Sequence, residues 1–266
     1  MKYVAVFFLC FLSLSLCWSD LPDGNYGAFS GTNYYNAQNS THLDPNKNPN
    51  KSGEMTIEAY AYLEKLPSQD QVFIIASKAD NFKYTKLFPE YPSIMTLDYG
   101  YALYITSQGR VVFILKYRTE SDTQIKIIEK CFNSDNLITL NKWLHVMCTI
   151  SLTKNMGTIG LDGVQKTEVI ATNATNITYT TAIADFYVGW SPNMKERFCG
   201  KIDELRVSQC CRYSQKALGV DSYTIPLDPF TSDTSTMGLW HFDEQQWSSQ
   251  EAQDSSRYRC SLLKKE

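Results

Sequence analysis

The segment Cys199-Gly-Lys-Ile-Asp-Glu-Leu-Arg-Val207 decides the fold class of this chain. Apolar and charged residues alternate along it, with the period of an extended strand. Strand geometry puts two sets of side chains on opposite faces, namely Ile202, Glu204 and Arg206 on one face and Asp203, Leu205 and Val207 on the other. Neither face is uniformly apolar, and buried charges need partners. We therefore expect Asp203, Glu204 and Arg206 to form a structural network of hydrogen bonds and ion pairs.

The same period-two alternation continues on both sides of this segment, and no stretch longer than about 12 residues has helical periodicity. The predicted strands cover residues 26–30, 55–63, 72–78, 102–105, 111–117, 124–128, 143–152, 158–161, 186–189, 200–208 and 237–242. Long polar connections are expected at residues 36–51, 81–92 and 214–235. Many short strands bounded by turn residues predict an all-β fold, an antiparallel β-sandwich.

Several motifs follow one another in an order that is typical of one family. They are the opening segment 24–35, a strand at 55–60, a hairpin at 101–113, Trp143-Leu-His-Val146 with a turn at 159–163, the segment 186–207, and Gly238-Leu-Trp-His-Phe-Asp-Glu244 with Asp254-Ser-Ser256. In this order they resemble the laminin-G-like jelly rolls of the concanavalin A-like lectin/glucanase superfamily. The resemblance spans about residues 24–260, and it implies a jelly-roll sandwich.

The N-terminus predicts export. Lys2 precedes an uncharged apolar run from Tyr3 to Trp18, and Ser19 precedes Asp20, which is the layout of a cleaved signal peptide. The run is shorter than the ~20 residues that a membrane-spanning helix needs. We therefore expect residues 1–19 to be removed, and residues 20–266 to form a single secreted domain without membrane insertion.

The charge composition excludes two classes of binding partner. The formal net charge is −3 at pH 7, so nothing steers this chain toward nucleic acid or an anionic membrane. The family resemblance, and not the composition, implies the partners that we expect, either a glycan or an extracellular glycoprotein.

Six cysteines lie outside the signal peptide, and an even number in an exported chain favours disulfides whose pairing stays open. They are Cys131, Cys148, Cys199, Cys210, Cys211 and Cys260. Two pairings are disfavoured, because vicinal Cys210–Cys211 would be strained and Cys199–Cys210 would span a whole strand. Zinc is the rival use of cysteine, but the chain has no C-x-x-C pair and only three histidines. Four sequons predict N-glycosylation in loops, at Asn39, Asn50, Asn173 and Asn176.

The superfamily that this chain resembles includes glycosidases, which have the pattern E-x-D-x-E on one strand. The positions of Asp and Glu in this sequence therefore indicate whether it could be such an enzyme. Retaining hydrolysis needs two carboxyl groups ~5 Å apart. Here Asp203 and Glu204 are adjacent, which predicts opposite faces. His42 is expected in solvent, and His145 and His241 as packed or hydrogen-bonded residues. The sequence therefore predicts that the protein is not an enzyme.

The one cofactor that the resemblance suggests is a structural Ca²⁺, because related jelly rolls hold this ion with carboxylates and carbonyl oxygens at a sheet edge. The corresponding positions here are Asp203 and the turn Ser30-Gly31, although serine at 30 removes a carboxylate. Asp243 and Glu244 with Asp254 form an alternative acidic cluster.

Binding is the function that remains. Aromatic residues make up 13% of the chain, and aromatic rings near turns can stack on sugar rings. The candidates are Trp190, Tyr34, Tyr35, Tyr99 and Tyr91. We expect a secreted, non-catalytic protein that recognises glycans or extracellular glycoproteins. The alternatives are a structural or adhesive extracellular protein with a protein partner and, more remotely, a glycosidase-like enzyme.

Overall fold

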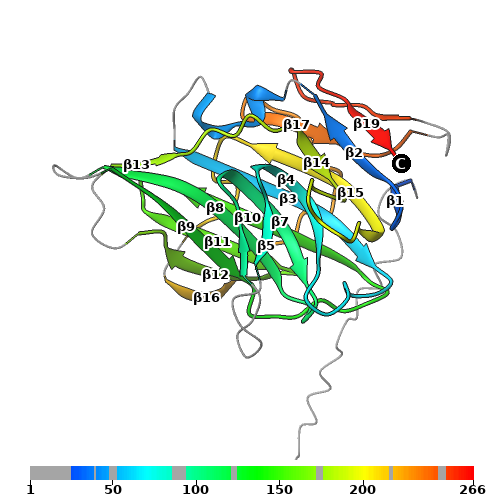
Figure 1. Cartoon of the computed structure of the whole chain (residues 1–266), viewed down its shortest axis with the longest axis horizontal. Helices are drawn as coiled ribbons and strands as arrows, with labels where there is room; N and C mark the ends of the chain where they lie inside the picture. Colours follow the sequence, from blue (N-terminus) through cyan, green and yellow to red (C-terminus); the bar gives the residue numbers. More distant parts are fainter. Residues whose placement is uncertain are drawn as a thin grey trace, which may run out of the picture.

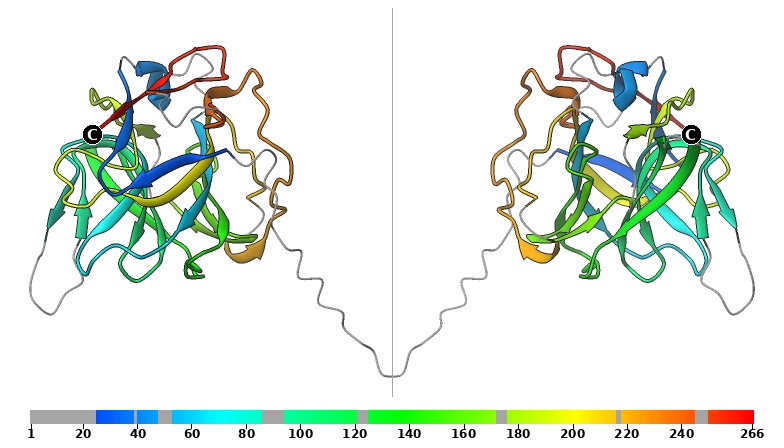
Figure 2. Two further views of the ribbon diagram at one scale, coloured as in Figure 1. Left: turned by 90° about the vertical axis from the view of Figure 1, so that its right-hand side faces the viewer. Right: turned by 90° about the vertical axis from the view of Figure 1, so that its left-hand side faces the viewer.

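A computed structural model describes residues 25–38, 40–47, 53–85, 94–120, 125–171, 176–215, 218–244 and 250–266. Two antiparallel sheets face each other across one hydrophobic core, which confirms the predicted all-β sandwich (Figures 1 and 2). Among the described residues no helix is long and apolar enough to span a membrane. The helices described are two single 3-10 turns, η1 (Thr41–Leu43) and η2 (Pro45–Lys47).

The first sheet has eight strands. In spatial order they are β1 (Gly27–Ser30), β15 (Cys199–Ser208), β3 (Glu54–Leu63), β10 (Trp143–Ser151), β11 (Met156–Leu161), β12 (Val164–Val169) and β16 (Gly219–Ser222), with β17 (Thr236–Trp240) also paired to β15. The quoted segment is thus the strand β15, which lies between β1 and β3.

The second sheet has nine strands. In spatial order they are β13 (Asn176–Tyr179), β8 (Val111–Glu120), β7 (Tyr99–Thr106), β4 (Val72–Asp80), β14 (Phe186–Val188), β2 (Tyr34–Ala37), β19 (Leu262–Lys265) and β18 (Glu251–Ala252), with β9 (Ile125–Asn133) also paired to β8. A separate hairpin joins β5 (Lys83–Thr85) to β6 (Ile94–Thr96).

The alternation of side chains builds the core between the sheets. Leu144, Val146, Cys148 and Ile150 of β10 point inward, toward the apolar side chains of the opposing sheet. Connecting segments also cover part of each outer face, since Phe230 packs on Tyr60 outside the first sheet and Phe82 and Met95 pack outside the second. Several strands are therefore buried on both faces.

The alternation predicted for β15 is wrong at one point. Asp203 pairs with Tyr60 and Arg206 pairs with Glu58, so two residues of β15 oppose one residue of β3. This β-bulge sets Glu204 at a φ of +53° and reverses the alternation after it. Asp203 and Arg206 consequently share the outer face, whereas Ile202, Leu205 and Val207 belong to the core.

The sequence also missed several short strands. The loop expected at 36–51 contains part of β2, and the connection expected at 214–235 contains β16, which is exposed throughout. Strands of about four residues are too short to carry a clear periodic signal.

Candidate functional site

A layer of buried polar side chains covers the outer face of the first sheet. Glu58 is fully buried in the middle of β3, and the Arg206 guanidinium meets its carboxylate at 2.8 Å. The Tyr213 hydroxyl also donates to this carboxylate, and His145 lies 3.5 Å away. The expected structural network is present, with Glu58 as a member that the sequence did not single out.

The charge of Glu58 is stabilised by these partners. Burial alone raises the pKa of a carboxyl group, but the hydrogen bond to His145 and the charge of Arg206 outweigh it, so the pKa of Glu58 lies below its usual value. The carboxylate is therefore ionised in the folded protein at neutral pH.

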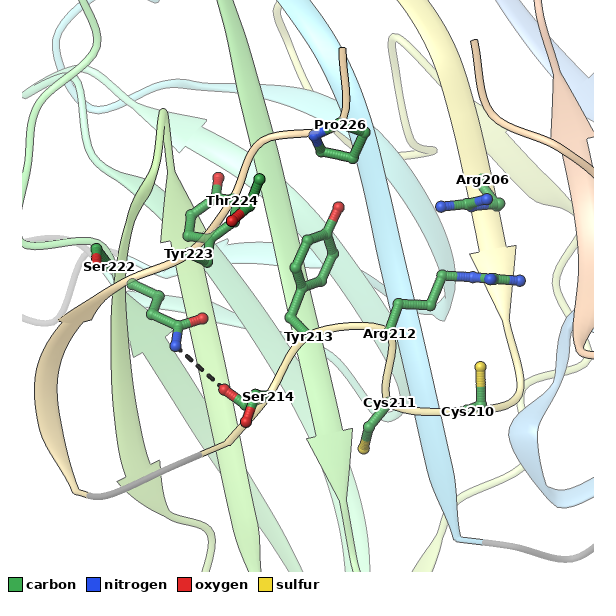
Figure 3. Close-up of a pocket in the computed structure, with 11 residues that line it drawn as sticks. Arg206, Cys210, Cys211, Arg212, Tyr213, Ser214, Ser222, Tyr223, Thr224 and Pro226 are labelled. Carbon is green, nitrogen blue, oxygen red and sulfur yellow. Dashed lines mark hydrogen bonds between the residues drawn. The ribbon is translucent and has the colours of Figure 1, made fainter. Parts of the chain in front are cut away.

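A pocket of about 630 Å³ opens beside this layer (Figure 3). After β15 the chain crosses the outer face of the first sheet at 210–214, pairs with the edge of β12 as β16, and returns at 222–226. The pocket lies between the outgoing and returning segments. Its lining residues are Gln165, Arg206, Cys210, Cys211, Arg212, Tyr213, Ser214, Ser222, Tyr223, Thr224 and Pro226.

Several groups at this pocket are held firmly. The Tyr213 and Tyr223 rings meet edge to face, 5.2 Å between centroids, and the Tyr223 hydroxyl lies 2.9 Å from Nδ1 of His145. Arg212 forms an ion pair with Asp233 at 2.9 Å. Gln165 donates from Nε2 to the Ser214 carbonyl oxygen.

Other groups at the pocket have no hydrogen-bond partner among the described residues. The Gln165 side-chain oxygen is buried and accepts no hydrogen bond. The hydroxyls of Ser214, Ser222 and Thr224 are exposed and make no hydrogen bond to the described residues. Because both arginines are paired with carboxylates, this pocket suits an uncharged ligand rich in hydroxyl groups.

Sequence reasoning missed this site. Of the lining residues it had named only Arg206, as part of a structural network, and the two cysteines, as disulfide candidates. Tyr223 lies in the long polar connection expected at residues 214–235, and Tyr213 directly precedes that connection. The bulge and the β12–β16 pairing bring them together, and neither feature has a local sequence signal.

The predicted aromatic residues separate into three places. Tyr34 and Trp190 lie together on the second sheet, 4.8 Å between ring centroids, and Tyr187 joins them. The Arg197 guanidinium lies over both the Tyr34 and the Trp190 ring, at 5.1 and 5.5 Å from their centroids. It therefore competes for the ring faces that a sugar would use.

The other aromatic candidates do not join this cluster. Tyr35 is buried in the core against Phe29, so it is unavailable to a ligand. Tyr99 is 41% exposed, but it pairs with Asp80, whereas Gly189 beside Trp190 bonds to Ile75. Asp80 and Ile75 are five residues apart along β4, so Tyr99 lies about 16 Å along the sheet from the position of Trp190. Tyr91 lies outside the described residues.

The expected calcium ligands are also separated. Ser30 pairs with Cys199, four residues along β15 from Asp203, a distance of about 13 Å. Ser30 and Gly31 therefore cannot share an ion with Asp203. In the alternative cluster, the Asp254 carboxylate accepts the backbone N–H groups of Leu239, Ser256 and Cys260 and has a structural role.

Asp243 instead lies beside Glu204 and His241. Glu204 accepts a hydrogen bond from the Phe230 N–H at 2.7 Å and lies 2.7 Å from Nδ1 of His241. The bulge brings the Asp203 and Glu204 side chains to the same outer layer, so the expectation that they point to opposite faces was wrong. Burial, followed by the charge of Glu204, raises the pKa of Asp203 to about 8.

The three histidines are all partly or fully buried. His145 and His241 are hydrogen-bonded, as expected. His42 was expected in solvent, but it is half-buried and stacks on Tyr258 at 4.4 Å between centroids, and this burial lowers its pKa.

All six cysteines are described, and each is a free thiol in this structure. The disulfides therefore stay a prediction. Burial raises the pKa of Cys131 and of Cys260 to about 11. Of the sequon asparagines only Asn176 is described. It is exposed and begins β13 instead of lying in a loop, whereas Asn39, Asn50 and Asn173 fall outside the described residues, as do residues 1–19.

A family model described as the concanavalin A-like lectin/glucanases superfamily, Laminin_G_3, matches residues 30–216. The chain belongs to this superfamily. No curated protein matches the sequence.

Among solved structures, a Bacteroides ovatus protein thought to bind carbohydrate is 16% identical, with a TM-score of 0.48 over 90% of this chain. The alignment spans 59% of that longer protein. The CBM40 of Ruminococcus gnavus IT-sialidase, bound to α2,3-sialyllactose, is 16% identical, with a TM-score of 0.43 over 70% of this chain and 90% of that one. Mouse laminin α1 domains LG4-5 are 14% identical, with a TM-score of 0.43 over 77% of this chain and 48% of that one.

Proposed function

We propose that this chain is a secreted, non-catalytic carbohydrate-binding protein, and that its sugar occupies the pocket between residues 210–214 and 222–226. The observation that carries the proposal is a pocket lined by two tyrosine rings and by three hydroxyls, those of Ser214, Ser222 and Thr224, that make no hydrogen bond to the described part of the chain. Sugars present both hydroxyl groups and apolar C–H faces, which match these two kinds of surface.

The composition of the pocket also supports binding without hydrolysis. Glycoside hydrolysis uses a pair of carboxyl groups that flank the scissile bond. The described residues that line this pocket include no carboxylate. Neither Asp203 nor Glu204 lines the pocket, and the Glu204 carboxylate instead accepts a hydrogen bond from the Phe230 N–H.

The test is a glycan-array screen of the chain beginning at Asp20, followed by calorimetry with the best glycan. We expect the double variant Ser214→Ala, Thr224→Val to bind at least about tenfold more weakly, because two hydrogen bonds of ~1 kcal/mol each are lost. Both side chains are exposed, so the fold should be unchanged. No glycan should be hydrolysed.

The control is the double variant Tyr34→Ala, Trp190→Ala, which alters the aromatic cluster on the second sheet. It should bind the glycan as the parent does. If this variant alone lost glycan binding, the sugar site would lie at the aromatic cluster and not in the pocket. A screen in which no glycan is bound would overturn the proposal.

Secretion rests on the N-terminal sequence, with the apolar run from Tyr3 to Trp18. N-terminal sequencing of the protein secreted by eukaryotic cells should begin at Asp20. Retention of Met1 in the product would contradict it.

A further inference from the structure

Three potential metal ligands meet at the edge of the first sheet, outside the proposed sugar pocket. Glu204, His241 and Asp243 each offer one ligand atom, and these atoms all lie within 4.8 Å of one another. Glu204 is buried, His241 is partly buried and Asp243 is exposed. One side of the cluster therefore faces the protein interior and the other side faces solvent.

The backbone explains why these residues converge. Glu204 belongs to the bulge of β15, and His241 and Asp243 follow directly after β17, the strand that pairs with β15. Phe242 lies between them, with a φ of +59° and its ring buried against Tyr35. The flanking side chains thereby face Glu204 while Phe242 anchors the turn in the core.

Asp203, the neighbour of Glu204 in β15, places a further buried carboxyl group beside the cluster. Asp203 is 3% exposed, and its carboxylate has a single hydrogen bond, in which Oδ1 accepts the Glu204 N–H. Its second oxygen makes no hydrogen bond to the described residues. A cation held between the Glu204 and Asp243 carboxylates, whose ligand oxygens lie within 4.8 Å of each other, would offset the repulsion between them.

We propose that Glu204, His241 and Asp243 bind a divalent transition-metal ion such as Zn²⁺. One imidazole nitrogen and two carboxylate oxygens are a donor set that suits Zn²⁺, whereas Ca²⁺ prefers six or more oxygen ligands. The hydrogen bond between His241 and Glu204 would give way to two coordinate bonds. With three protein ligands and Asp243 at the surface, the fourth position is open to water or to an external ligand.

This site is distinct from the calcium position that the family resemblance suggested, which combined Asp203 with Ser30 and Gly31. It also differs from the sugar pocket, with which it shares no lining residue. The sequence disfavours zinc because the chain has no C-x-x-C pair and only three histidines. Glu204 is far in the sequence from His241 and Asp243, so no short sequence motif marks these three residues as a ligand set.

The test is a calorimetric titration of Zn²⁺ into the untagged chain beginning at Asp20, together with thermal unfolding in Zn²⁺, Ca²⁺ and EDTA. We expect one Zn²⁺ per chain and a higher melting temperature in Zn²⁺ than in Ca²⁺ or EDTA. The variants Asp243→Asn and His241→Gln should each weaken Zn²⁺ binding at least about tenfold, as loss of a ligand does. Asp243 is exposed, so Asp243→Asn tests the proposal even if His241→Gln folds poorly.

The matched control is Asp228→Asn, which removes an exposed carboxylate outside the cluster and should leave Zn²⁺ affinity unchanged. Three results would each overturn the site. They are no Zn²⁺ binding at micromolar concentration, Zn²⁺ binding that Asp243→Asn leaves unchanged, and stronger stabilisation by Ca²⁺ than by Zn²⁺.

Discussion

At the scale of single residues, the least expected feature is the charge of Glu58 in the middle of β3. Its neighbours Ile57 and Ala59 belong to the core, so the strand itself looks like an ordinary alternating strand. The carboxylate is tolerated because Arg206, Tyr213 and His145 surround it. A buried charge of this kind is costly to leave unpaired, so it couples β3 to β15 and to the segment over the pocket.

This coupling predicts a dependence of stability on pH. The pKa of Glu58 is lower in the folded protein than the ordinary 4.5, so its contribution to stability is present above about pH 4.5 and is lost as the pH falls below that value. Glu58→Gln should cost ~3–5 kcal/mol at pH 7, because Arg206 is left without its partner. Urea unfolding at pH 7 and pH 3.5 should show that the difference from the parent shrinks at the lower pH.

The comparison for this variant is Glu120→Gln, which removes a carboxylate that is nearly half exposed in its ion pair with Arg118. Its effect should stay below ~1 kcal/mol at both pH values. An equal loss at pH 7 and pH 3.5 for Glu58→Gln would show that the carboxylate is not ionised in the folded state.

At the scale of elements, β15 connects the structural and functional parts of the molecule. It pairs with β1, β3 and β17, and its bulge directs Arg206 to Glu58 and Glu204 to His241. The strand begins with a close approach of two backbones. A Cβ atom on Gly200 would lie 2.1 Å from the Tyr62 carbonyl oxygen, at a φ of +148°.

The variant Gly200→Ala should therefore destabilise the protein by ~3 kcal/mol or more, since strain and steric overlap add. Gly31→Ala is the matched control, because Gly31 also has a positive φ, of +80°, but a Cβ atom there would meet nothing within 4 Å. Its cost should be only about 1 kcal/mol. The measurement is the free energy of unfolding in urea, and similar losses in the two variants would refute the role of the backbone contact.

At the scale of the whole molecule, the sandwich extends beyond the part that the family model covers. The match ends at residue 216, but β16, β17 and β19 complete both sheets afterwards. Trp240 of β17 is fully buried and stacks on Phe186 of the other sheet, 5.4 Å between ring centroids. We therefore propose that residues 20–266 fold as one domain.

A chain of residues 20–216 should then lack a cooperative thermal transition, because it exposes the edge of β15 and loses the Trp240 anchor. The chain of residues 20–266 should unfold in a single transition, and removal of Glu266 alone, which lies beyond β19, should change nothing. Circular dichroism and calorimetry would measure both. A sharp transition in the short chain would place the domain boundary at residue 216.

The sequence by itself determined the fold class and the identity of most core strands. Alternating apolar residues in strands such as β10 are local information, since each residue's face follows from its neighbour's. The polar network around Asp203, Glu204 and Arg206 could also be predicted, because charges inside a buried strand must find partners. His145 and His241 were expected to be packed or hydrogen-bonded, and both are hydrogen-bonded.

Only the tertiary structure decided where the sites lie. One residue inserted at the bulge moved Asp203 to the face of Arg206 and brought Glu204 to His241 and Asp243, and no local pattern marks such an insertion. The pairing of β16 with β12 carried Tyr223 back to Tyr213 and formed the pocket. Both sites join segments distant in the chain, and their geometry depends on pairing register, which alternation within a single strand does not specify.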